Sequence, residues 1–166
     1  MESRAPSKKQ FGITLVELTI VLGLFIIMLT VLTLLINPAT QKKRARDNKR
    51  LSDISNLDRV ILEYKLDTGQ YPDAVNTLRT SNTLPPTGLS LDSASAGWVL
   101  GDFLTYTSSL PLDPFNDDTY FYSYFHDGNS YELSTLLEYL TEEPQNDGGN
   151  DNNSYETGNK LDLISP

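Results

Sequence analysis

The sequence contains no cysteine and only one histidine, His126. Without cysteine the chain cannot form a disulfide framework or a thiolate metal site. Cysteine usage therefore gives no indication of whether the protein lies in an oxidising or a reducing compartment. A single histidine also excludes a metal site with two imidazole ligands. A Ser-His-Asp triad would rest on this one residue, which we expect to be exposed in a hairpin turn. We therefore predict that the protein is not an enzyme.

Basic residues are scarce beyond residue 50. Residues 51–166 hold four basic and nineteen acidic side chains, a net charge of −15, whereas residues 42–50 hold six basic side chains and one acidic. So acidic a region repels phosphate backbones, which argues against nucleic acid as a partner. The basic stretch fits acidic surfaces of neighbouring copies, and it fits equally well a solvated or headgroup-binding face beside a membrane.

One long hydrophobic run is present, at residues 13–36, and it is broken only by Glu17, Gly23 and four threonines. As a helix this run would reach about 36 Å, more than the roughly 30 Å of hydrocarbon in a bilayer. It is longer than the core of a secretory signal, and no small-residue cleavage site follows it. We therefore predict a retained membrane anchor.

Glu17 is the unusual residue of this run, because a carboxylate in a membrane segment is costly. Its position near the helix start lowers the cost, since a helix N-terminus attracts an anion. Cleavage between Gly12 and Ile13 would add an α-amino cation at the start of the helix. If many copies pack with a stagger, that amine in one copy would meet Glu17 of the next and set their register.

A second helix is predicted after the anchor. Pro38 lacks a backbone donor and should kink or interrupt the helix. Beyond it, apolar residues recur at steps of three and four, which is typical of an amphipathic helix. This stripe consists of Leu51, Ile54, Leu57, Ile61 and Tyr64. Gly69 and Pro72 are typical of a helix that ends near Asp67.

The stripe needs a covering sheet. Residues 119–125 and 130–137 flank the sequence HDGN, and this pattern predicts a β-hairpin. We interpret the aromatic side chains of residues 120–125 as faces of the sheet rather than a ligand cage, and Trp98 as a core residue.

The remaining segments are less regular. Residues 73–97 are typical of a long loop, and the pattern of residues 97–107 fits a short helix and a strand equally well. Residues from 141 onward favour a polar loop or tail with one terminal strand at most. The predicted organisation is 1–12, leader; 13–36, transmembrane and polymerisation helix; 37–68, amphipathic extension; 69–140, globular β domain; 141–166, polar tail.

The residues KKQFG followed by ITLVELTIVLGLF resemble the prepilin signal of type IV pilins and type II secretion pseudopilins. The similarity extends to GQYP at the end of the second helix and to LPLDPFNDDTYFYSYF before the hairpin, and covers about residues 6–72 and 110–138. It implies an α+β, pilin-like fold, in which a long N-terminal helical spine, membrane-spanning in its first half, packs on a small antiparallel β-sheet.

The resemblance also implies a processing site. In that family a membrane aspartyl peptidase removes a short basic leader that ends in Gly, the new N-terminus is methylated, and the fifth mature residue is a Glu. Carried over, these features imply cleavage between Gly12 and Ile13, N-methylation of Ile13 and an assembly role for Glu17. Ile13 departs from the usual Phe, which bears on methylation rather than on cleavage.

The partners implied are copies of the same chain in a helical filament, the membrane, a prepilin peptidase, and a pilus or secretion assembly machinery. The N-terminus would be cytoplasmic and the C-terminal domain extracytoplasmic, on the cell surface after assembly. The positive-inside rule opposes this topology, because residues 1–12 hold three basic side chains and residues 42–50 hold six. A surface pilus, a DNA-uptake pilus and a secretion pseudopilus stay open, as does a permanently anchored binding module that does not polymerise.

Calcium is the one cofactor suggested. Some major pseudopilins bind it near the entrance to their sheet, and a loose resemblance extends this to Asp113, Asp117, Asp118 and Asp127. Carboxylate oxygens are ligands that calcium prefers. However, the family's longer loop is missing here, and acidic turns are more often merely solvated.

Overall fold

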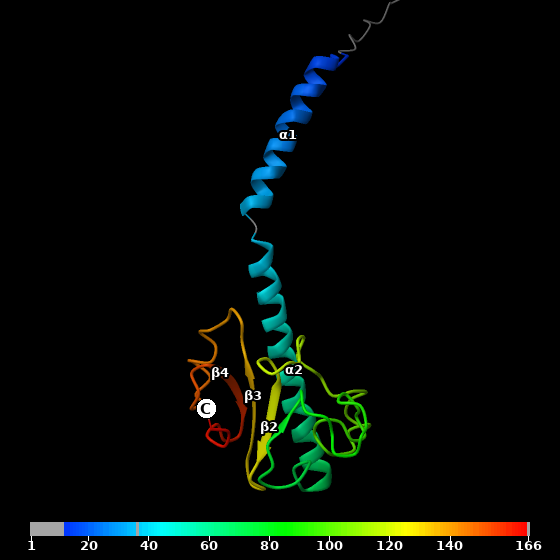
Figure 1. The fold of residues 1–166 in the computed structure, drawn as a ribbon, viewed down its shortest axis with the longest axis vertical. Coiled ribbons are helices and arrows are strands. Elements are labelled where there is room, and N and C mark those ends of the chain that lie inside the picture. Colours follow the sequence, from blue (N-terminus) through cyan, green and yellow to red (C-terminus); the bar gives the residue numbers. More distant parts are fainter. Residues whose placement is uncertain (1–11, 36, 166) are drawn as a thin grey trace, which may run out of the picture. The chain divides into compact units, whose positions relative to one another are not determined.

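The computed structural model describes residues 12–35 and 37–165, with two helices followed by four strands (Figure 1). The predicted leader lies outside the described residues apart from Gly12, and so does residue 36. The chain divides into two compact units, Met1–Gln41 and Lys42–Pro166.

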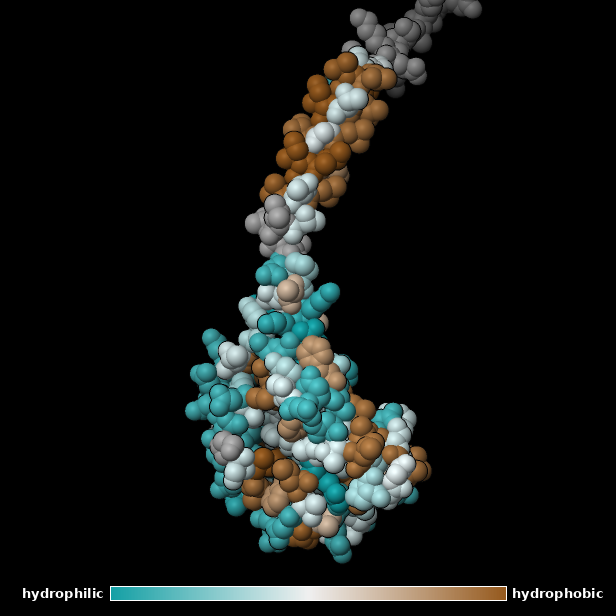
Figure 2. Space-filling view, in the orientation of Figure 1, coloured by the Kyte–Doolittle hydropathy of each residue, from teal (hydrophilic) through white to brown (hydrophobic). Residues whose placement is uncertain are grey.

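Helix α1, Leu15–Leu35, is apolar on all sides. Its stretch Leu15–Thr33 is long and apolar enough to cross a membrane, and none of it is buried in the structure. Figure 2 shows this surface as mostly brown, interrupted by paler patches. The hydroxyls of Thr19, Thr30 and Thr33 donate to backbone carbonyls one turn earlier, at 2.8–2.9 Å. These polar groups are satisfied inside the helix, as an apolar environment requires.

Helix α2, Pro38–Thr68, begins at the proline that was predicted to interrupt the spine. Asn37 caps it, because its Oδ1 accepts the backbone N–H groups of Ala39 at 3.1 Å and Thr40 at 3.4 Å. Proline suits the first helical position, where no N–H is needed. The helix ends one residue beyond the predicted Asp67, and Gly69 follows with a left-handed φ of 78°.

The sheet has four antiparallel strands in the order β1-β2-β3-β4. They are β1, Arg79–Thr80; β2, Tyr122–His126; β3, Tyr131–Leu136; and β4, Ser154–Gly158. Strands β2 and β3 form the predicted hairpin, and Asp127 Oδ1 accepts the N–H groups of Asn129 and Ser130 in its turn at 2.8 and 2.7 Å.

Two further strands complete the sheet. Strand β1 lies inside the segment 73–97, which was predicted to be a loop. Strand β4 pairs with β3 and lies in the segment 141–166, for which a polar loop or tail with one terminal strand at most was predicted. The pattern of β4, SYETG, has too few apolar residues to reveal a strand, so pairing with β3 rather than hydrophobicity fixes it. The sheet therefore continues past residue 140.

The core lies between α2 and one face of the sheet. From α2 it contains Ile54, Leu57, Val60 and Ile61, and from the sheet Tyr122, Tyr124, Tyr131 and Leu133. The tyrosine hydroxyls tie the two layers, since Tyr122 donates to Asp53 at 2.8 Å and Tyr131 to Asp58 at 2.5 Å. The predicted apolar stripe is thus confirmed. The interpretation of the aromatic residues as sheet faces is confirmed for Tyr122, Tyr124 and Phe125, whereas Tyr120 and Phe121 precede β2.

Residues 97–107 form neither the helix nor the strand that the sequence allowed, but a series of turns. They still supply Trp98, Val99 and Phe103 to the core. The indole N–H of Trp98 donates to the carbonyl of Pro111 at 3.2 Å, so this buried polar group is satisfied. The prediction that Trp98 is a core residue is confirmed.

His126 is not exposed, contrary to the expectation from its place beside a turn. Strand β2 runs one residue further than predicted, and His126 is only 2% exposed. Its ring lies 5.8 Å from the rings of both Tyr71 and Tyr124. Neither of its nitrogens has a hydrogen-bond partner among the described residues.

Candidate functional site

Glu17 is held by Thr14 at the start of α1. Its Oε2 accepts the backbone N–H and the hydroxyl of Thr14, both at 3.0 Å, and the Glu17 N–H donates to Thr14 Oγ1 at 3.2 Å. This is a capping box, in which the N-cap threonine and the third helical residue satisfy each other's free donors. The pattern T-x-x-E would have revealed it in the sequence. A local role for Glu17 therefore exists beside any role between copies.

The residues on both sides of the predicted cleavage site precede the first helical turn. Gly12 and Ile13 are exposed, and Ile13 retains 78% of its accessible surface. Exposed backbone outside regular secondary structure is where proteases cut most readily. Cleavage here would leave the capping box intact, because Thr14 and Glu17 both lie after the cut.

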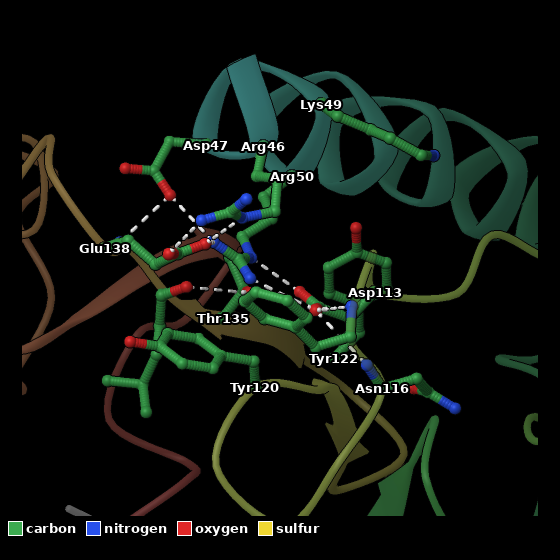
Figure 3. A network of polar contacts seen from close by, with 12 residues as sticks. Arg46, Asp47, Lys49, Arg50, Asp113, Asn116, Tyr120, Tyr122, Thr135 and Glu138 are labelled. Atoms are coloured by element: carbon green, nitrogen blue, oxygen red, sulfur yellow. Dashed lines mark hydrogen bonds and ion pairs between the residues drawn. The ribbon is translucent and has the colours of Figure 1, made fainter. Parts of the chain in front are cut away.

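A second polar cluster lies in the Lys42–Pro166 unit and centres on Arg50, whose side chain is fully buried. Figure 3 shows Arg46, Asp47 and Arg50 of α2 facing Asp113 and Glu138. Arg50 Nε is 2.6 Å from Asp113 Oδ2, and its NH1 is 2.7 Å from Glu138 Oε1 and 2.8 Å from Asp47 Oδ1. Burial opposes the charged form of Arg50, but its hydrogen bonds to Asp113 and Glu138 outweigh that effect and raise its pKa.

Glu138 bridges the two arginines. Arg46 binds it in two-point fashion, with Nε and NH2 each 2.6 Å from a carboxylate oxygen. The bonds from Arg46 and Arg50 outweigh the effect of burial and lower the pKa of Glu138 to about 2. Asp47 completes the cluster, because it accepts the N–H groups of residues 138–140 at 2.7–3.1 Å. The cluster therefore joins α2 to the segments before β2 and after β3.

Sequence reasoning missed this cluster, although a signal was present. Asp47 and Arg50 continue the spacing of the apolar stripe at Ile54 and Leu57, and so lie on the same buried face of α2. Charged residues on such a face indicate a buried ion-pair network rather than a solvated surface.

The cluster also changes the interpretation of the basic stretch 42–50. Arg46 and Arg50 are bound as described, Lys49 pairs with Asp53 at 2.6 Å, and Arg44 donates to the hydroxyl of Tyr139 at 2.8 Å. Among the described residues, only Lys42 and Lys43 of the six have no hydrogen bond or ion pair inside the unit. A role in pairing with neighbouring copies would fall mainly to these two.

The four acidic residues proposed for calcium do not share a site in the structure. Asp113 accepts hydrogen bonds from Arg50. Asp117 and Asp127 accept backbone N–H groups of their own turns, and Asp118 is exposed. Across residues 12–35 and 37–165 no three His, Cys, Asp or Glu side chains gather in a way that could hold a metal ion. Calcium binding by this set therefore stays a prediction that the geometry does not fit.

An exposed apolar helix with a capped carboxylate at its start, followed by an amphipathic helix on a small antiparallel sheet, defines a pilin-like subunit. Comparison with known proteins narrows this class. The family model described as Type II secretion system (T2SS), protein G matches residues 37–154. The type II secretion system core protein G of Escherichia coli (strain K12) is 31% identical over 115 residues, covering 66% of this chain and 70% of the relative. No solved structure gives a significant match.

The chain therefore belongs to the type II secretion system protein G family, the family of major pseudopilins. It is a structural subunit of the pseudopilus and not an enzyme. Of the filaments that the sequence left open, the secretion pseudopilus is the one that the family identifies. A permanently anchored binding module is accordingly set aside.

Proposed function

We propose that the chain is made as a precursor, cleaved by a prepilin peptidase between Gly12 and Ile13, methylated at Ile13, and assembled into a filament through α1. The observation that carries this proposal is the complete exposure of an apolar helix that begins with a carboxylate. Such a surface needs lipid before assembly and neighbouring helices after it. Packing of many α1 helices would replace contacts with lipid by contacts between copies.

Glu17 would then have two successive partners. In the precursor, Thr14 satisfies its carboxylate within one chain. After cleavage, the new amine of Ile13 in a neighbouring copy would offer a full positive charge, which a buried carboxylate favours over neutral donors. Pairing of this amine with Glu17 would set the stagger between copies, and a copy out of register would leave a charge unpaired in an apolar core.

The same proposal gives a topology and the remaining partners. Residues 1–12 would be cytoplasmic, α1 would cross the inner membrane once, and the Lys42–Pro166 unit would be extracytoplasmic, in contact with the secretion assembly machinery. Because the positive-inside rule opposes this arrangement, a direct test is needed. A C-terminal alkaline phosphatase fusion should be active in cells. An inactive fusion would indicate the opposite topology, with the C-terminal unit in the cytoplasm.

Intact mass of the membrane-extracted chain tests the processing step. In cells with a prepilin peptidase the mass should equal that of residues 13–166 plus one methyl group, and without the peptidase the leader should remain. Gly12→Leu should keep the leader in both cells, whereas Gly23→Ala, which alters a glycine within α1, should be processed normally. Retention of the leader by the wild-type chain in both cells would contradict the proposal.

A further inference from the structure

Two buried glutamates lie side by side on the face of the sheet that points away from α2. Glu132 on β3 is 0% exposed and Glu156 on β4 is 3% exposed. The register pairs Ser134 with Glu156 and Glu132 with Gly158, which makes the two glutamates diagonal neighbours on one face. Burial, together with the neighbouring Glu132 carboxyl group, raises the pKa of Glu156.

Each glutamate also holds a neighbouring segment. Oε2 of Glu132 accepts the backbone N–H groups of Leu163 at 2.7 Å and Ile164 at 2.9 Å. Oε2 of Glu156 accepts the N–H of Asp151 at 3.1 Å. The other oxygen of Glu132, Oε1, is buried and has no partner among the described residues. This orphan acceptor requires a donor.

No cation of the described residues compensates the pair. Asp147 and Asp151 face it from the loop 146–153, and both are acidic. Lys160 and Asp162, on the segment after β4, pair with each other at 3.2 Å on the surface. Two buried carboxyl groups in contact cannot both be ionised without a counter-charge. Since no group of three potential metal ligands was found among the described residues, a proton is the simplest donor.

We propose that Glu132 and Glu156 share one proton, which fastens residues 159–165 and the loop 146–153 onto the sheet. The hydrogen bonds indicate which of the two carboxyl groups carries this proton. Glu132 accepts two N–H groups and is therefore the ionised partner, while Glu156 carries the proton and donates it to Oε1 of Glu132. The C-terminal segment is then held by a carboxylate whose orphan oxygen is satisfied.

The shared proton makes this attachment sensitive to pH. Burial, followed by the contact with Glu132, raises the pKa of Glu156 to about 7. Because the pKa is raised above its ordinary value, the stabilisation is fully present at low pH and is lost as the pH rises through about 7. A cavity of about 260 Å³ adjoins the segment, and its lining includes Glu156, Ile164 and Ser165.

Hydrogen exchange of the full chain in detergent with a chelator present, followed by mass spectrometry, tests the proposal. Protection of residues 159–165, corrected for the intrinsic effect of pH, should fall about 30-fold between pH 5.5 and 8.5, given a pKa near 7 in the attached state and 4.5 when released. Glu156→Gln keeps a donor for Glu132 and an acceptor for Asp151, so it should stay protected at both pH values. Glu156→Ala should lose protection at both.

Glu142→Gln is the matched control, because it removes one acidic group at an exposed position and should keep the wild-type pH dependence. Unchanged exchange of β2 and β3 in each variant would show that the sheet is intact. Equal loss of protection in wild type and Glu156→Gln would overturn the proposal. Restoration of wild-type protection at pH 8.5 by millimolar calcium would also overturn it, because a cation rather than a proton would then hold the pair.

Discussion

Arg50 and Asp113 lie 63 residues apart and form a buried two-point ion pair, with Nε 2.6 Å from Oδ2 and NH2 3.2 Å from Oδ1. Both side chains are fully inaccessible. The pair joins the middle of α2 to the segment that enters β2. With two arginines and three acidic residues, the surrounding cluster carries a net charge of −1. Loss of either arginine would therefore leave a larger excess of buried negative charge.

Replacing Arg50 should therefore be strongly destabilising. Arg50→Met would leave Asp47, Asp113 and Glu138 with fewer cations in a buried site, and breaking such a pair costs about 3–5 kcal/mol of unfolding free energy. Urea unfolding of the full chain in detergent measures this, with the single buried Trp98 as a fluorescent probe. Lys49→Met, which breaks a surface pair, is the control and should barely move the midpoint. Equal effects of the two variants would contradict a structural role for the cluster.

Glu138 should make the protein sensitive to strong acid. Its pKa is lowered to about 2 by hydrogen bonds from Arg46 and Arg50, so its contribution to stability is present above about 4.5 and is lost as the pH falls towards 2. Unfolding free energies measured across this range should decline for the wild type. Glu138→Gln should be less stable at pH 7 and show a flatter profile, and an unchanged slope would count against this assignment.

The sequence predicted those parts of the molecule in which one physical signal dominates. The stripe from Ile54 to Ile61 and the aromatic hairpin were found because hydrophobic period and turn chemistry point to one answer. The sequence did not locate strand β4, because SYETG has no hydrophobic period and the strand is fixed only by its long-range pairing with β3. Two of the acidic partners of Arg50, Asp113 and Glu138, come from distant segments, and no local pattern identifies them.

Glu17 illustrates the same limit at the candidate site. Its residue type and position could be read from the chain, and so could the T-x-x-E capping box with Thr14. A partner of Glu17 in another copy of the chain cannot be identified from the structure of a single chain. Residues 1–11 of the predicted leader 1–12 lie outside the described residues, and processing stays a prediction.

His126 should add a second, milder loss of stability at moderately low pH. Burial lowers its pKa below the ordinary 6.5, outweighing the nearby Asp73 and Asp127. The neutral ring is therefore favoured in the folded state, and stability present above about 6.5 is lost as the pH falls below that value. His126→Phe should remove this part of the pH dependence below about 6.5. A profile that His126→Phe leaves unchanged would argue that His126 is not held neutral.

Gly97 and Gly69 should differ in their tolerance of alanine. A Cβ on Gly97 would lie 2.5 Å from the carbonyl oxygens of Leu91 and Ser93, so backbone must move. Gly69 has open space but a φ of 78°, which costs alanine about 1 kcal/mol. Gly97→Ala should therefore lower the melting temperature clearly more than Gly69→Ala in a thermal unfolding experiment. The reverse order would show that the segment around Gly97 is not packed as described.

The central claim, assembly through the charge of Glu17, is tested most directly by the yield of sheared filaments from cells that express Glu17→Gln. Glutamine can keep the capping box with Thr14 while it removes the charge. Thr14→Val is the companion variant, because it keeps the charge and removes the hydroxyl from the box. We predict that Glu17→Gln is inserted and cleaved to the same mature length as the wild type but yields no filaments, whereas Thr14→Val still assembles. Filaments at wild-type yield from Glu17→Gln would contradict the account.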